Sequence, residues 1–206
     1  MTLADKFTST RIILAPVFFI IYLFHFHSQF FLSFLPLAKE SFLFASAAWT
    51  VPVLWILFLV SEITDMLDGM AARKQDKVSD TGKLFDPFAD TLTQITYFLC
   101  FVIDGIFSPV FFLLVLYREF SILFVRNMML KNGVAMGARI SGKIKTVAYI
   151  LACTLALLTS SFMRLGINNE FYQWILFSAR AVFIFSVVIA IISFIDYFLV
   201  FTKTLN

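Results

Sequence analysis

Six long apolar segments, separated by short polar connections, dominate this sequence. A helix that crosses a bilayer needs about 20 mostly apolar residues. The predicted spans are residues 8–26, 45–71, 81–104, 108–130, 141–163 and 172–201. Composition agrees, since 61% of the chain is hydrophobic and 14% is charged, against about 25% charged in soluble domains. The sequence therefore predicts an all-α, polytopic membrane protein with six transmembrane helices in a single domain, residues 1–206.

Positive charges are distributed unevenly between the connections. With six helices, both termini and the second and fourth connections share one side, which holds 11 of the 16 Lys and Arg residues. The opposite connections hold Lys39 and Arg164. Positive residues are enriched in cytoplasmic loops, so both termini are predicted to be cytoplasmic. Residues 28–44 are apolar but are interrupted by Pro36, Lys39 and Glu40, which favours an interfacial segment.

Two pairs of aspartates lie on either side of a short basic connection. Asp65 and Asp68 stand at i, i+3 near the end of the second predicted helix, so they share one helix face. Asp86 and Asp90 stand at i, i+4 near the start of the third and also share a face. Because these helices are antiparallel neighbours, all four carboxylates are expected to converge in a polar site at the cytoplasmic side.

Four carboxylates at a membrane boundary need protons or cations between them. Oxygen ligands suit hard cations such as Mg²⁺ or Mn²⁺, and two ions are a common arrangement for displacement at phosphorus. Arg73 offers a planar fork to a phosphate. Small residues near the aspartates leave room for a nucleotide or phosphate to approach; they are Gly69, Ala72 and Gly82.

Simpler explanations exist for parts of this pattern. The glycines also fit helix ends and turns, and Asp86 before Pro87 also fits a helix N-cap. Intramembrane acids occur in ion and proton transporters as well. Transporter acids are expected toward the bilayer midplane, whereas these cluster at helix ends. The pattern therefore favours a metal-dependent enzyme, and no nucleic-acid partner is predicted.

The aspartate stretch resembles the signature of the CDP-alcohol phosphatidyltransferase family, Asp-x2-Asp-Gly-x2-Ala-Arg-x8-Gly-x3-Asp-x3-Asp. Each fixed position of that signature is present; the residues are Asp65, Asp68, Gly69, Ala72, Arg73, Gly82, Asp86 and Asp90. Near the start of the chain, Thr8-x2-Arg11 resembles the Thr-x2-Arg of many bacterial members. Those members often carry Asn six residues before the arginine, where this chain has Asp5.

The resemblance implies transfer of a substituted phosphate from a CDP-linked alcohol to a second alcohol, with release of CMP. It implies two ions, Mg²⁺ or Mn²⁺, held by Asp65, Asp68 and Asp86. Asp90 is implied as the general base, with a contact to metal. The implied CDP and diphosphate contacts are Thr8, Arg11, Asp68, Gly69, Ala72, Arg73 and Gly82. The implied location is the cytoplasmic membrane of a bacterium.

Three further stretches resemble the branch of the family that joins CDP-diacylglycerol to glycerol 3-phosphate. They are Asp86-Pro-x-Ala-Asp90, Arg118-Glu119 and Ser141-Gly-Lys-Ile-Lys-Thr-Val147. Asp196-Tyr-Phe198 shows a weaker resemblance. Against this, Thr91 stands where that branch usually has Lys. A phosphorylated acceptor needs fixed cations, and the candidates are Arg118, Arg139, Lys143 and Lys145. For the lysines, anchoring to anionic lipid is an equal alternative.

Side chains of adjacent helical residues point apart, so a purely mutual pair of Arg118 with Glu119 is not expected.

Inositol, inositol phosphate, serine, choline and ethanolamine stay open as acceptors or as parts of another donor. The expected partners are CDP-diacylglycerol, a small polar alcohol and membrane lipids. Because members of the family tend to dimerise, a homodimer is also an expectation.

Overall fold

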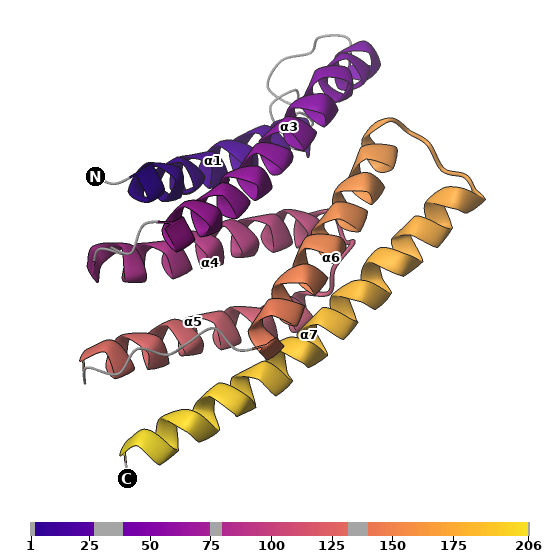
Figure 1. Ribbon diagram of the computed structural model, residues 1–206. Helices are drawn as coiled ribbons and strands as arrows, with labels where there is room; N and C mark the ends of the chain where they lie inside the picture. The colour runs from indigo at the N-terminus through magenta and orange to yellow at the C-terminus, as the bar shows by residue number, and fades with distance from the viewer. Residues whose placement is uncertain (1–2, 27–38, 75–79, 132–139, 206) are drawn as a thin grey trace. The chain divides into compact units, whose positions relative to one another are not determined.

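The computed structural model describes residues 3–26, 39–74, 80–131 and 140–205. These ranges contain six helices and no strand (Figure 1). The helices are α1 (Leu3–Phe26), α3 (Lys39–Lys74), α4 (Asp80–Ile103), α5 (Pro109–Lys131), α6 (Ile140–Arg164) and α7 (Glu170–Leu205). The predicted all-α class is confirmed.

The largest difference from a predicted helix boundary lies at the start of α3, and α1 also begins earlier than predicted, at Leu3. The sequence predicted an interfacial segment up to residue 44, whereas α3 already begins at Lys39. Lys39 and Glu40 are good helix formers, and the next proline along the chain is Pro52. Nothing therefore ends the helix between Lys39 and the predicted span. Residues 28–38 of the predicted segment lie outside the described part of the chain.

Within the described residues, three helical stretches are long and apolar enough to cross a membrane. They are Ala48–Leu67, Ser141–Arg164 and Glu170–Leu199, and Thr8–Phe24 is a shorter apolar helix. α4 and α5 carry more ionisable side chains, among them Asp86, Asp90, Arg118, Glu119 and Arg126. The predicted membrane character is thus present in the structure.

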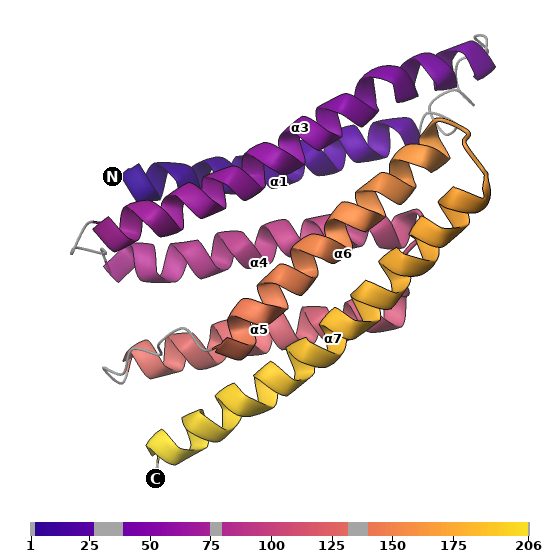
Figure 2. The same cartoon turned by 45° about the vertical axis from the view of Figure 1, so that its right-hand side comes forward.

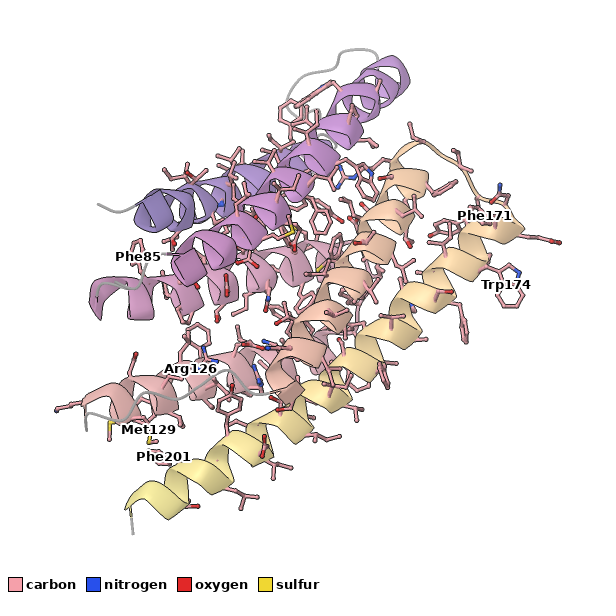
Figure 3. All side chains as sticks on the ribbon, viewed as in Figure 1. Phe85, Arg126, Met129, Phe171, Trp174 and Phe201 are labelled. Carbon is pink, nitrogen blue, oxygen red and sulfur yellow. The ribbon has the colours of Figure 1, made fainter. Side chains whose placement is uncertain are left out.

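Large apolar side chains cover much of the outer surface. Trp174 is 69% exposed and Ile20 is 65% exposed. Figure 3 shows Phe171 and Trp174 pointing away from the start of α7. Soluble proteins rarely expose apolar area on this scale, and Trp is enriched at membrane interfaces. A lipid environment accounts for this surface.

The chain forms two compact units. Unit 1 contains Met1–Cys100 and Ser160–Tyr172. Its helices α1 and α3 lie side by side and antiparallel, and α4 runs back along α3 (Figures 1 and 2). The start of α1, the end of α3 and the start of α4 therefore lie at one end of this unit. That end receives the aspartates.

An aromatic core holds the three helices of unit 1 together. The ring of Tyr97 on α4 lies 4.6 Å from Phe18 of α1 and 5.4 Å from Phe58 of α3, centroid to centroid. All three side chains are buried. On α1, Arg11 and Phe18 stand seven residues apart, which puts both on one helix face. The face that builds the core therefore also carries a charged group to the end of the unit.

Unit 2 contains Phe101–Thr159 and Gln173–Asn206. Phe107 stacks on Phe183 of α7 with centroids 3.9 Å apart. The turn after α4 contains Gly105 at φ 71°, a conformation that favours glycine. Arg180 of α7 donates to two carbonyls of this turn, from Nη2 to Gly105 at 3.0 Å and from Nε to Ile106 at 3.1 Å. These bonds fasten the turn to α7.

Candidate active site

Three carboxylates converge at the end of unit 1. Asp65 lies near the end of α3, and Asp86 and Asp90 lie one turn apart on α4. One ligand oxygen from each of the three lies within 4.8 Å of the others. All three side chains are partly exposed. The structure thus brings together three of the four aspartates that the sequence singled out.

A buried arginine contacts all three carboxylates. Arg11 lies on α1 with 2% of its side chain exposed. Its Nη1 atom donates to Asp65 and Asp90, and its Nη2 atom donates to Asp86. One guanidinium therefore connects α1, α3 and α4 at the same point. The sequence suggested a nucleotide contact for Arg11 and did not predict these ion pairs.

The carboxylate cluster fits hard divalent cations. Oxygen atoms on opposite sides of one Mg²⁺ lie about 4.2 Å apart, since each bond is about 2.1 Å long. The three oxygens lie within 4.8 Å of one another, which is compatible with this value. Arg11 supplies one positive charge against three carboxylates, so the cluster keeps an excess of negative charge. Asp65, Asp86 and Asp90 could therefore hold Mg²⁺ or Mn²⁺.

The side chains of several predicted site residues lie outside the described part of the structure. Asp68, Gly69, Ala72 and Arg73 belong to α3 and Gly82 belongs to α4, but their side-chain surroundings are not among those described. Arg139 lies outside the described residues altogether. Thr8 is described: it is buried on α1, one turn before Arg11.

The N-cap alternative for Asp86 is wrong. α4 begins at Asp80, so Asp86 and Pro87 lie almost two turns inside the helix. An N-cap residue sits at the first position of a helix and satisfies its free amide groups. Asp86 instead contacts Arg11 of α1. Its carboxylate is therefore part of the cluster.

Glu62 is a group that the motif did not identify. It lies one turn before Asp65 on α3, and the charges of Asp65 and Arg11 both act on its carboxyl group. The i, i+3 spacing from Asp65 was the available signal. Glu62 places a further carboxyl group beside the cluster.

A second charged cluster lies inside unit 2. Glu119 Oε1 accepts from Arg118 Nη1 at 2.8 Å and from Lys145 Nζ at 2.9 Å, and all three side chains are buried. Arg118 also donates from Nε to the carbonyl of Ala190 at 3.2 Å and from Nη2 to Ser193 Oγ at 3.2 Å. Arg118 does pair with its neighbour Glu119, because both side chains are long enough to meet. The pair is not purely mutual, since Lys145 shares the same oxygen.

Arg126 is less fully paired than Arg118. On α5 (Figure 3) it donates from Nη2 to the hydroxyl of Tyr197 at 3.4 Å and lies 5.6 Å from the centre of that ring. Its Nε atom is buried and has no hydrogen-bond partner among the described residues. A Cβ at Gly142 would lie 3.5 Å from the same hydroxyl, and Ser141 Oγ donates to Asp196 at 3.3 Å. The two sequence stretches noted at 141–147 and 196–198 therefore meet in unit 2.

Residues 1–192 match the family model described as CDP-alcohol phosphatidyltransferase. The match covers most of the chain, and the protein belongs to this family. It is therefore a transferase enzyme, and the transporter alternative is set aside. The converging aspartates lie within the matched region.

Bacterial relatives share similarity over most of the chain. A protein of Treponema pallidum is 36% identical over 208 residues, covering 100% of this chain and 92% of the relative. A protein of Bacillus subtilis is 34% identical over 157 residues, covering 76% of each. A protein of Mycoplasma genitalium is 29% identical over 144 residues, covering 68% of this chain and 60% of the relative. Each is named CDP-diacylglycerol–glycerol-3-phosphate 3-phosphatidyltransferase.

Proposed function

We propose that this protein transfers the phosphatidyl group of CDP-diacylglycerol to glycerol 3-phosphate, giving phosphatidylglycerophosphate and CMP. The observation that carries the proposal is the convergence of Asp65, Asp86 and Asp90 in a chain of this family. The name shared by the relatives supports the donor and the acceptor. The reaction would form one bond from the acceptor oxygen to phosphorus and break the bond from phosphorus to CMP.

The aspartates would divide the work between binding and proton transfer. Asp65, Asp68 and Asp86 would hold Mg²⁺ or Mn²⁺, with two ions favoured by the number of carboxylates. The ions would supply positive charge against the diphosphate. Asp90 would accept the proton of the acceptor hydroxyl as the new bond forms. Gly69, Ala72, Arg73, Gly82 and Thr8 are proposed to contact the CDP part of the donor.

We place the chain in a bacterial cytoplasmic membrane as six spans with both termini cytoplasmic. The charge distribution of the sequence supports this placement. The family match over residues 1–192 supports a single catalytic domain. The donor would then reach the aspartates from the bilayer and the acceptor from the cytoplasm. Formation of a homodimer stays a prediction.

The acceptor phosphate needs a cation that is free to pair with it. Arg118 and Lys145 share Glu119, which reduces the charge they can offer. Lys143 is exposed, and Arg126 has a buried Nε without a partner among the described residues. We therefore favour Arg126 and Lys143 as the groups that meet the phosphate, with Arg139 as a further candidate.

Arg126→Gln is expected to raise KM for glycerol 3-phosphate about tenfold or more, because a hydrogen bond to a charged group contributes about 1.5–3 kcal/mol. KM for CDP-diacylglycerol should change much less. Initial rates of CMP release, with each substrate varied in turn, measure both constants. Lys131→Gln removes an exposed charge from the end of the same helix and should leave both constants near wild type. Equal effects on the two KM values would mean that Arg126 supports the structure and does not bind the acceptor phosphate.

The proposed reaction is tested by CMP release from the purified protein in detergent. CDP-diacylglycerol and Mn²⁺ or Mg²⁺ are supplied with one acceptor at a time: glycerol 3-phosphate, inositol, inositol phosphate, serine or choline. We expect release with glycerol 3-phosphate alone, and loss of activity with EDTA. Activity with a different acceptor would keep the aspartate chemistry and reject the assigned acceptor. Activity that survives EDTA would reject the metal centre.

A further inference from the structure

We propose that Arg11 is a built-in counter-ion of the metal centre, which holds the three carboxylates together before metal binds and is displaced when it does. The inference rests on the proposed function, because it concerns the same aspartates. It assigns Arg11 a role in the metal-free protein that is separate from any contact with the donor.

The first argument is that guanidinium and metal compete for the same atoms. Arg11 donates to the Oδ1 atoms of Asp65, Asp86 and Asp90. A divalent ion must approach carboxylate oxygens to about 2.1 Å. A guanidinium within hydrogen-bond reach of all three oxygens fills that space, and two cations at this separation repel each other. The two kinds of binding therefore exclude each other at these oxygens.

The second argument is that the three carboxylates need a positive charge in order to remain together. Like charges this close destabilise the folded protein unless a cation lies between them. Arg11 contacts all three carboxylates and is almost fully buried.

The helix that carries Arg11 is fixed by the contact of Phe18 with Tyr97. The side chain can therefore change its torsions while its backbone stays in place.

Displacement would leave a guanidinium beside a metal-loaded site. A planar guanidinium matches the oxygens of a phosphate, and the donor carries a diphosphate. Metal loading would thus release the cation that the donor needs. Binding of metal and binding of donor are coupled through one side chain in this scheme.

A second buried arginine in unit 1 provides a matched control. Arg164 is 9% exposed, and its described partners are neutral. It donates from Nε to Ser160 Oγ at 3.2 Å and from Nη2 to the carbonyl of Tyr22 at 3.1 Å, and lies 4.3 Å from the Tyr22 ring centre. Removing Arg164 also removes a buried cation, but leaves the aspartates untouched.

The test uses full-length protein in detergent without substrate, as wild type, Arg11→Gln, Arg11→Lys and Arg164→Gln. Each protein is titrated with Mn²⁺, and the electron paramagnetic resonance signal of the free ion gives the metal affinity. Thermal unfolding is recorded separately in EDTA and in saturating Mn²⁺. For Arg11→Gln we expect Mn²⁺ to bind on the order of tenfold more tightly, a change of about 1.4 kcal/mol. Its unfolding midpoint should fall in EDTA and recover in Mn²⁺. Arg164→Gln should lower the midpoint equally in both and keep the wild-type affinity.

Arg11→Lys retains the charge and loses the fork, so its affinity should lie between wild type and Arg11→Gln. If Arg11→Gln does not fold in EDTA, the Mn²⁺ affinity of Arg11→Lys is compared with that of wild type instead. Unchanged or weaker Mn²⁺ binding by both Arg11 variants, with normal binding by wild type, would overturn the role of Arg11 and leave the proposed function standing. A wild-type protein that binds no Mn²⁺ would reject the metal centre and this inference together.

Discussion

Asp90→Asn is expected to lower the rate of CMP release by about 10²–10⁴-fold, the range attributed to a positioned proton acceptor. The amide keeps the shape of the side chain but cannot take a proton from the acceptor hydroxyl. Asp90 lies on the face of α4 that also carries Asp86, and its carboxylate belongs to the cluster with Asp65. Turnover at saturating concentrations of both substrates measures the effect, because it is insensitive to weaker binding.

Two further variants separate proton transfer from metal binding. Asp86→Asn should lose activity that high Mn²⁺ restores in part, whereas Asp90→Asn should stay inactive at any Mn²⁺ concentration. Asp104→Asn alters an aspartate just beyond the other end of α4 and should behave as wild type. Full recovery of Asp90→Asn by Mn²⁺ would mean that Asp90 serves only as a metal ligand and that another group accepts the proton.

Glu119→Gln is expected to destabilise the protein by about 3–5 kcal/mol, the cost of leaving buried charge without its partner. The carboxylate accepts from both Arg118 and Lys145, and all three side chains are buried in unit 2. Glutamine keeps the volume and one acceptor oxygen, but the two cations would then face each other without a negative charge. The midpoint of thermal unfolding in detergent should fall by several degrees.

A double variant shows whether charge is the cause. Lys145→Met removes one of the two cations, so the pair Glu119→Gln with Lys145→Met should be more stable than Glu119→Gln alone. Glu170→Gln, at the start of α7, removes an exposed carboxylate and should leave the midpoint unchanged. A Glu119→Gln protein as stable as wild type would show that this cluster does not stabilise the fold.

The sequence was most informative where local periodicity decides the outcome. The i, i+4 spacing of Asp86 and Asp90 places both on one face of α4, whichever helices pack against it. Long apolar runs predicted helices, and all six have a counterpart in the described residues. The early start of α3 at Lys39 was missed because polar residues beside an apolar run resemble the end of a helix.

Contacts between distant helices could not be predicted in the same way. Arg11 is 54 residues from Asp65, and only the packing of α1 on α3 and α4 brings them together. The role of Glu119 depends on Lys145, which a different helix supplies. Arg126 drew no functional prediction because an arginine within a span has no motif of its own. Asp68 and Arg139, outside the described side chains, remain predictions.

The contacts of α7 have a consequence for how the protein is made. Arg180 holds the carbonyls of Gly105 and Ile106 after α4, and Ser193 with the carbonyl of Ala190 accepts from Arg118 of α5. Each of these partners belongs to α7, which is synthesised after α4 and α5. Before α7 is present, the carbonyls of Gly105 and Ile106 lack their bonds from Arg180. Arg118 likewise lacks two of its acceptors. Unit 2 can therefore be completed only after α7 has been synthesised.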